Sequence, residues 1–285
     1  MAEPFGGRSN RSPPERIEPW TWRPQLVGLP NWEGVDRVQR TALEHPAFDL
    51  TSHWRRGGFR ESLTAGSDRD SAAFLDRLIA NDLFVLPGTT LRGVEIRRDR
   101  FLRLIARYNG HQLESLRRRT GWDRPTFDHV IGSLIAQDAI FTLPFEPVIA
   151  ERSNLYYFRD TGILHRLFNP KWTEQENGRG YFAKSWEGLA IQTIMYGPGR
   201  DADASVWRHA DDEIDLVLRW PGGTPCWAIE IGMGEDKRPS RGFWTGVEHL
   251  GATRRCIIHR GACDELGNLE RLTLERFLES WSSST

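Results

Sequence analysis

The chain has 285 residues, of which 39% are hydrophobic and 27% are charged, and its formal net charge at pH 7 is −1. These values are typical of globular proteins, so they exclude a strongly basic chain and allow one large domain or two smaller ones. Three cysteines without CxxC spacing favour a reduced, cytoplasmic protein over a disulfide framework or a zinc site. No apolar run approaches the ~18 residues of a membrane span and no apolar leader opens the chain, so we expect no membrane contact.

The first 50 residues are rich in proline, glycine, arginine and serine, which is typical of segments that do not fold by themselves. Trp20, Trp22 and Trp32 are unusual in such a segment and would allow it to dock onto the folded body. We therefore expect residues 1–50 to be largely disordered.

Residues 51–165 are predicted to form a helical region. Apolar residues recur at helical spacing in 71–85 and again in 98–108, where Asn109 and Gly110 are suited to end the helix. These two helices are expected to pack through one apolar face each.

A helix-turn-helix pattern follows. A short helix at about 112–120 precedes a turn at Gly121, and a second helix begins near Pro125, since proline is tolerated in the first turn of a helix. Two strand-like segments, 139–141 and 156–158, supply the strands of a hairpin. Helix, glycine-containing turn, helix and hairpin form the pattern of a winged helix-turn-helix. The apolar face of the second helix is expected to consist of Val130, Ile131, Leu134 and Ile135.

Arginine is concentrated in this region. Between Leu91 and Val130 there are ten arginines and five acidic residues. Such a local surplus indicates contact with nucleic acid, and we expect DNA to be bound there. The alternative is a solvated face of a helical packing module, since winged helices also make protein–protein contacts. The predicted contact residues are Arg117, Arg118, Arg119 and Arg124.

Residues 166–180 are predicted to be a linker, and residues 181–285 a second domain. Its elements are expected in the order helix, three strands, helix, strand and helix, at 181–196, 205–208, 213–220, 226–233, 240–250, 255–259 and 274–281. This order is that of an α/β domain.

Two acidic residues lie inside the second and third of these strands, which a Pro-Gly-Gly turn joins. Side chains of a strand alternate between its faces, so Ile214 and Leu216 are expected on one face and Asp215 on the other. If the strands pair, Asp215 and Glu230 converge on one side of the sheet, and Glu187 of the preceding helix can reach the same point.

Converging carboxylates repel one another, and a hard divalent cation such as Mg²⁺ relieves the repulsion. A metal held in this way can activate water for phosphodiester hydrolysis. A helical Glu, an Asp and then Glu-x-Lys is the active-site pattern of the PD-(D/E)XK (restriction-endonuclease-like) fold, but Gly232 stands at the lysine position. Loss of such an acid–base group costs about 10²–10⁴ in rate. The alternative is that Asp215 and Glu230 form ion pairs at a strand edge, with Arg208, Arg219 or Lys237.

From about Trp54 to its end the chain resembles a domain family of unknown function, number 4143, which is the C-terminal part of a prokaryotic P-loop (AAA-type) ATPase family. The resemblance rests on short stretches that occur in order along the chain. They are Arg56-Gly57-Gly58-Phe59, Asn81-Asp82-Leu83, Phe158 to His165 (FRDTGILH), Ser185-Trp186-Glu187-Gly188, Glu213 to Val217 (EIDLV), Ala228 to Ile231 (AIEI) and Pro239 to Phe243 (PSRGF).

This resemblance implies a winged helix followed by a PD-(D/E)XK-like domain, with Glu187, Asp215 and Glu230 at the acidic positions. The chain departs from the family where Glu-x-Lys is replaced by Glu230-Ile231-Gly232, although Lys237 remains able to swing in. The chain also lacks the ATPase domain and the Gly-Lys-Ser/Thr of a Walker A loop, so neither ATP hydrolysis nor an ATP cofactor is expected.

Three functions fit these observations. The first is a nucleic-acid-binding protein with a nuclease-type fold whose phosphodiesterase chemistry is weak or lost. The second is an active Mg²⁺-dependent DNA nuclease in which Lys237 or Lys184 replaces the missing lysine. The third is an interaction module without enzymatic activity that binds a protein partner, such as a separate ATPase or its own copies.

Overall fold

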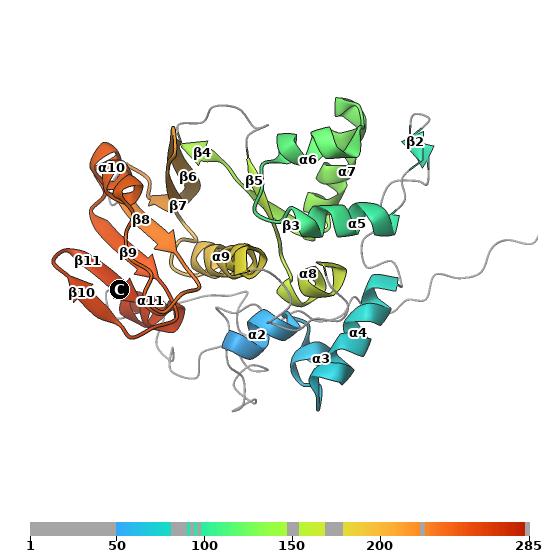
Figure 1. The fold of residues 1–285 in the computed structure, drawn as a ribbon, viewed down its shortest axis with the longest axis horizontal. Coiled ribbons are helices and arrows are strands. Elements are labelled where there is room, and N and C mark those ends of the chain that lie inside the picture. The colour runs from blue at the N-terminus through green and yellow to red at the C-terminus, as the bar shows by residue number, and fades with distance from the viewer. Residues whose placement is uncertain are drawn as a thin grey trace, which may run out of the picture.

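The computed structural model describes residues 50–80, 90–91, 94–95, 98–146, 154–168, 179–222 and 226–282 (Figure 1). The predicted N-terminal segment, apart from Leu50, and most of the predicted linker lie outside these ranges. Within them the chain is a mixed α/β structure, and none of its helices has the length and apolarity needed to cross a bilayer.

The N-terminal helices form a small group around a later one. Helices α2 (Leu50–Arg56), α3 (Arg60–Leu63) and α4 (Asp68–Ala80) pack against one another, and α2 and α4 also pack against α8 (Thr161–Phe168). The helix predicted at 71–85 is therefore α4, which begins three residues earlier, while residues 81–85 lie outside the described ranges.

Asp160 holds α2 and α8 together. This buried carboxylate accepts the backbone N–H of Gly58 at 2.7 Å and that of Ile163 at 2.8 Å, the second bond satisfying a free donor in the first turn of α8. A side chain on Gly57, whose φ is +78°, would overlap Asp160, and one on Gly162 would overlap a backbone carbonyl of α2. The stretches Arg56 to Phe59 and Phe158 to His165, on which the resemblance partly rests, thus pack tightly against each other and have a structural role.

The helices and strands predicted between residues 98 and 158 lie close to their predicted positions. They are α5 (Arg98–Arg107), α6 (Leu113–Thr120) and α7 (Arg124–Ala136), followed by the antiparallel strands β3 (Ile140–Leu143) and β5 (Leu155–Phe158). Gly121 ends α6 in the left-handed conformation, and the side chain of Asp123 caps α7 by accepting the Thr126 N–H at 2.8 Å. The prediction for Ile135 is wrong, because 42% of this side chain is exposed.

The β3–β5 pair lies between two hydrophobic clusters. Ile140, Tyr156 and Phe158 face the helical cluster, which contains residues of α5 and α7. The intervening side chains face the cluster of the large sheet; they are Phe141, Leu143, Leu155 and Tyr157. A strand that is apolar on both faces needs partners on both sides, so this pair joins the two halves of the molecule.

A mixed sheet of seven strands forms the C-terminal half. Its order is β10 (Asp264–Leu266), β11 (Leu269–Leu272), β9 (Arg254–Ile258), β8 (Cys226–Ile231), β7 (Asp212–Arg219), β6 (Asp203–His209) and β4 (Phe145–Glu146). The pairs β4–β6, β8–β9 and β9–β11 are parallel and the others antiparallel. A separate pair outside this sheet joins β1 (Thr90–Leu91) and β2 (Val94–Glu95).

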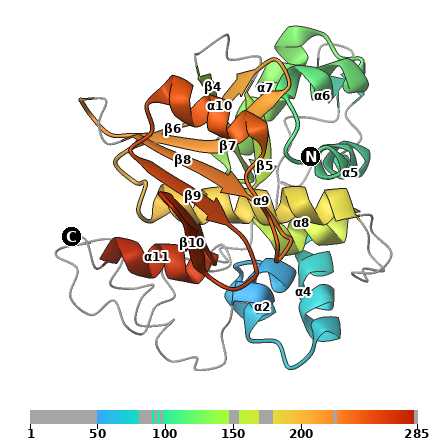
Figure 2. The ribbon, with the colours of Figure 1, turned by 60° about the vertical axis from the view of Figure 1, so that its left-hand side comes forward.

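Helices cover both faces of the sheet. Helix α9 (Arg179–Tyr196) packs on one face together with α11 (Leu274–Ser282), and α10 (Arg241–Leu250) packs on the other (Figure 2). Ser240 caps α10 by accepting the Phe243 N–H at 2.9 Å. The predicted order of helix, three strands, helix, strand and helix is confirmed, whereas β10 and β11 were not predicted.

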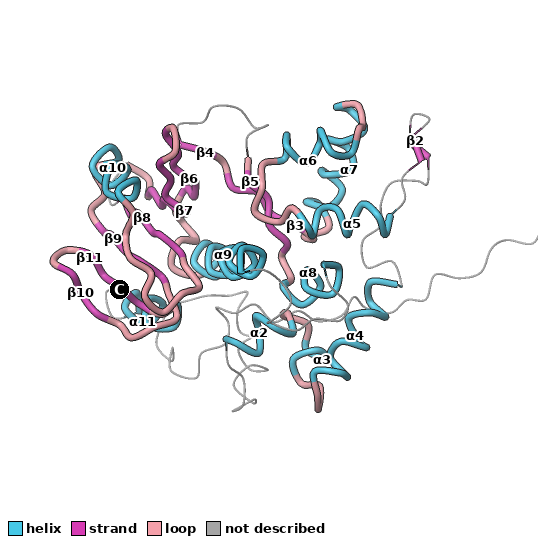
Figure 3. The backbone as a smooth tube through the Cα atoms, in the orientation of Figure 1, coloured by secondary structure: helices cyan, strands magenta, loops and turns pink. Residues whose placement is uncertain are grey.

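Strand β4 was not predicted either, and it comes from the N-terminal half. The backbone continues from β3 through Pro144 directly into β4, which pairs with β6 at the edge of the sheet (Figure 3). The predicted linker at 166–180 therefore follows a strand that belongs to the C-terminal sheet.

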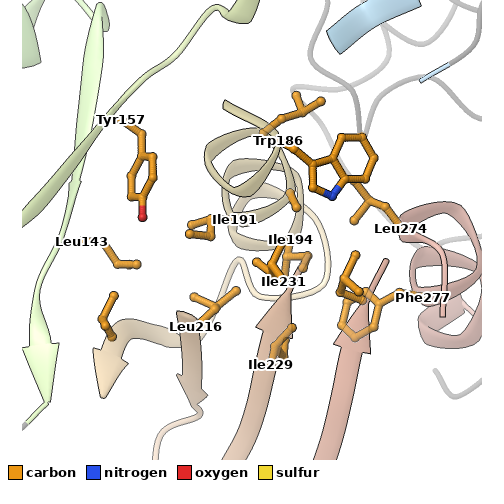
Figure 4. Close-up of a cluster of buried hydrophobic side chains, with 14 of the residues drawn as sticks. Leu143, Tyr157, Trp186, Ile191, Ile194, Leu216, Ile229, Ile231, Leu274 and Phe277 are labelled. Atoms are coloured by element: carbon orange, nitrogen blue, oxygen red, sulfur yellow. The ribbon is translucent and has the colours of Figure 1, made fainter. Parts of the chain in front are cut away.

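The main core lies between the sheet and α9. Ile191 and Ile194 of α9 pack with Leu216, Ile229 and Ile231, all of which are at most 5% exposed (Figure 4). Each such side chain contributes about 1.5–3 kcal/mol when it is fully removed from water. This layer fixes α9 over the ends of β7 and β8.

A polar contact inside the core ties α2 to α9. The Trp54 indole N–H donates to the Ser185 hydroxyl at 3.1 Å, and His165 Nε2 lies 2.7 Å from the same oxygen. Burial lowers the pKa of His165 to about 3, so the ring is neutral at pH 7. His165 is thus a core residue.

Candidate functional site

A β-bulge places Asp215. Ser205 of β6 pairs with Val217 and Trp207 pairs with Ile214, so β7 has two residues between these pairs where β6 has one. The bulge moves Ile214 to the face of the sheet that Val217 shares, where it packs under Gly246 of α10. The predicted alternation, with Ile214 and Leu216 on one face, is therefore wrong at this point.

Strands β7 and β8 separate next to the bulge. The last paired residues are Leu216 and Ile229, and beyond them the Asp215 carboxylate accepts the Ile231 N–H at 2.7 Å. This side chain thus replaces a bond that the backbone of β7 would otherwise make to β8. The acidic group of Asp215 is held at the point where the two strands diverge.

Glu187 is held by two donors. It lies on α9, is 6% exposed, and accepts Lys184 Nζ at 2.7 Å on each of its carboxylate oxygens. The Tyr157 hydroxyl of β5 donates to the same carboxylate at 2.6 Å. A side chain on Gly188 would lie 2.7 Å from the Tyr157 ring, so the glycine of the Trp-Glu-Gly stretch allows this tyrosine to approach the helix.

Glu230 is paired with Lys237. It lies on β8, is 7% exposed, and its Oε1 is 2.7 Å from Lys237 Nζ. The stem of Lys237 crosses Gly232, because a Cβ added at that glycine would lie 2.7 Å from Lys237 Cγ. A lysine from the following loop therefore occupies the space beside Gly232, the position at which the nuclease pattern has its own lysine.

The carboxylates interact electrostatically. Burial raises the pKa of Asp215 to about 7, and repulsion from Glu187 adds to this shift. Burial, together with repulsion from Asp215, also raises the pKa of Glu230 to about 7. Burial alone would lower the ammonium pKa values of Lys184 and Lys237, but the neighbouring carboxylates outweigh it and raise both. We call these five residues, with Tyr157, the carboxylate site.

The predicted Mg²⁺ site at Glu187, Asp215 and Glu230 stays a prediction. In the described ranges, no three histidine, cysteine or acidic side chains form a group that could hold a metal. Each acidic group of the carboxylate site already has a donor within the chain. Of the predicted ion-pair partners, Lys237 does contact Glu230, whereas Arg208 pairs with Glu213 and Arg219 with Glu146.

The predicted nucleic-acid contacts divide into two groups. Arg117 pairs with Glu114 at 2.7 Å, and Arg124 pairs with Asp128 at 3.2 Å, so these two cations are already compensated. Arg118 is exposed, and the Arg119 guanidinium lies 4.1 Å from the centre of the Tyr108 ring. The i to i+3 and i to i+4 spacing of the paired residues is a signal from which the two ion pairs could have been predicted.

Comparisons with known proteins place the chain among uncharacterised relatives. It is 28% identical over 265 residues to an uncharacterised protein of Mycobacterium tuberculosis and equally to one of Mycobacterium bovis. The match covers 84% of this chain and 56% of each relative, so the chain spans little more than half their length. No family model and no solved structure matches the chain.

The carboxylate site brings three carboxyl groups next to two lysine ammonium groups. Two acids with pKa values near 7 can exchange protons at neutral pH, and two lysines can compensate the charge of an anionic group. In the present arrangement these charges compensate one another.

Proposed function

We propose that the chain is a nucleic-acid-binding protein built on a nuclease-type α/β domain whose phosphodiesterase chemistry is weak or lost. One observation carries the proposal. The helical Glu187 and the strand acids Asp215 and Glu230 lie near enough for Asp215 to interact electrostatically with both of the others, and each acid is already bound by a donor of the same chain. These positions of the three acids support a nuclease-type site, and their ion pairs and hydrogen bonds within the chain support the loss of its chemistry.

Little hydrolysis is expected because donors of the same chain already bind the acids of the carboxylate site. An acid that is to accept a proton from water must be free of its lysine, and removing a partner from a buried pair is costly. Lys184 and Tyr157 both hold Glu187, and Lys237 holds Glu230. No step of this proposal depends on a metal ion.

The test is a cleavage assay on labelled single-stranded and duplex DNA, with and without Mg²⁺, combined with a binding assay. We expect binding without measurable cleavage in both conditions. The matched variant is Asp215→Asn, which keeps an oxygen acceptor for the Ile231 N–H. Robust cleavage by the wild type that Asp215→Asn abolishes would overturn the loss of chemistry, and absence of binding to any nucleic acid would overturn the proposal as a whole.

A second candidate, an active nuclease, is favoured by one specific contact. The Lys237 stem lies against Gly232 and its ammonium group pairs with Glu230, and these contacts support a role for Lys237 in place of the lysine missing at position 232. The discriminating variants are Lys237→Ala and Lys237→Ala with Gly232→Lys. An active nuclease predicts loss of cleavage in the first and recovery in the second. If the wild type and Lys237→Ala are equally inactive, this candidate is excluded.

A further inference from the structure

Residues of α5, α6 and the end of α8 line a large groove, and Figure 1 shows that these helices lie apart from strands β7 and β8 of the carboxylate site. Its volume is about 1090 Å³, which exceeds that of most small-molecule pockets. Its lining combines four arginines with aromatic and aliphatic side chains. We call it the arginine groove; it is lined by Arg100, Phe101, Arg103, Leu104, Arg107, Arg119, Thr120, Trp122, Leu167 and Phe168.

The arginines of α5 form a row. Arg100, Arg103 and Arg107 follow at intervals of three and four residues, so they share one side of the helix over a length of about 10 Å. All three are exposed, while Phe101 and Ile105 are buried. The row therefore faces the groove and solvent.

These cations lack acidic partners in the described part of the chain. Arg103 donates to the Leu167 carbonyl at 3.3 Å, and Arg119 stacks on Tyr108, but neither contact compensates a positive charge. No ion pair of Arg100 or Arg107 is found among the same residues. An uncompensated row of arginines produces a positive potential that favours a chain of phosphates over a single anion.

Two aromatic rings of the groove lining pack on other aromatic rings. Trp122 lies 4.7 Å from the buried Phe101 ring, and Phe168 stacks on Tyr181 with 3.5 Å between ring centres. Trp122 and Phe168 remain partly exposed, so each presents ring surface to the groove. Exposed rings beside a row of cations are the features with which proteins bind unpaired nucleotides, because every base can stack on them.

The helix that would enter a DNA major groove is less suitable for binding. In a helix-turn-helix the second helix reads the bases, and here that helix is α7. Its exposed positions include Asp128, His129 and Ile135, and its arginine, Arg124, is paired with Asp128. The uncompensated positive charge of this region thus lies on α5 and α6.

We infer that the arginine groove binds single-stranded nucleic acid, with phosphates along the α5 arginines and bases on Trp122 and Phe168. The inference rests on the proposed nucleic-acid-binding function and specifies its site and ligand. The contact residues differ from the predicted ones, since of those only Arg119 lines the groove.

The test measures binding of the full chain to a fluorescein-labelled oligothymidylate by anisotropy, between about 50 mM and 200 mM salt. The groove variant Arg100→Gln/Arg107→Gln is expected to bind the oligonucleotide about tenfold more weakly. Because it loses two phosphate contacts at ~0.7 each, the magnitude of its slope of log K against log salt concentration should fall by about 1.4. Trp122→Leu is expected to lose about fivefold with an unchanged slope. Thermal unfolding of each variant checks that the fold is retained.

The matched control is Arg69→Gln/Arg77→Gln, which removes the same charge from exposed positions of α4. Unchanged binding in this control, with loss in the groove variant, supports the inference. Equal losses in both, or no loss in the groove variant, overturn it while leaving nucleic-acid binding intact. Tighter binding of a duplex of the same length overturns the single-strand ligand. If the wild type binds neither strand form, both the inference and the proposed function fail.

Discussion

The carboxylate site and the arginine groove carry opposite charges and differ in how those charges are compensated. At the carboxylate site each of the three acids has a donor of the same chain within 2.7 Å. In the arginine groove the cations on α5 have no acidic partner among the described residues. Judged by residue types alone, the carboxylate site looks like an enzyme active site. By the same criterion, the arginine groove looks like the solvent-exposed side of an ordinary helix.

Among the described residues, the exposed arginines of α5 remain free to pair with an anion, whereas the acids of the carboxylate site already have donors within the chain. A compensated buried pair contributes mainly to structure, since breaking it costs more than forming it gains. An exposed row of like charges contributes little to stability and can be retained for binding. Three predictions test this contrast.

The largest effect is expected from Lys184→Met. This change leaves Glu187 buried with Tyr157 as its remaining donor, so we expect the free energy of unfolding to fall by about 2–4 kcal/mol in urea denaturation. The control is Lys184→Met/Glu187→Gln, in which the buried charge is also removed and part of the stability should return. If Lys184→Met is as stable as the wild type, the ion pair does not hold this site together.

A smaller effect is expected in the pH dependence of the free energy of unfolding. The pKa of Asp215 is raised to about 7 in the folded protein from an ordinary value of 3.8, so the folded state binds its proton more tightly than the unfolded state. The contribution of Asp215 to the free energy of unfolding is therefore fully present below about pH 4. It is lost as the pH rises towards 7 and changes little above pH 7. Between pH 5 and 8 we expect the wild type to lose about 2–3 kcal/mol more than Asp215→Asn.

The measurement is urea denaturation of both proteins across this pH range. Taking the difference between them removes the contribution of His165, whose lowered pKa acts in the opposite direction. A difference that does not vary with pH would mean that Asp215 is ionised in the folded protein over the whole range.

The smallest effect is expected from Arg100→Gln/Arg107→Gln, the variant with the largest loss of binding. These side chains are exposed and have no acidic partner in the described ranges, so the free energy of unfolding should change by less than about 0.5 kcal/mol. A loss of stability comparable to that of Lys184→Met would show that the arginine groove, too, is structural.

Much of the architecture could be predicted from local patterns. Asp123 and Ser240 cap α7 and α10, and Gly121 ends α6, because these residues act on the backbone next to them. The approach of Glu187 to Asp215 was also predicted, since helical and strand periodicity decide which face each acid occupies.

What could not be predicted depends on contacts between distant segments. The bulge in β7 arises from the pairing of β7 with β6. It could therefore not be predicted from the alternation of side chains within β7, and the face assigned to Ile214 was wrong. Strand β4 has two residues, too few for a periodic signal. The position of Lys237 over Gly232 results from the path of a loop, and the arginine groove exists only because α6 and α8 lie beside α5.

The short strand β4 limits how the molecule can be divided. It covers β6, which would otherwise be the last strand of the sheet and would expose unpaired N–H and C=O groups. A fragment consisting of residues 179–282 would therefore carry a bare strand that can recruit another chain, and it should self-associate. Fragments intended to isolate this half of the protein need to begin before Phe145.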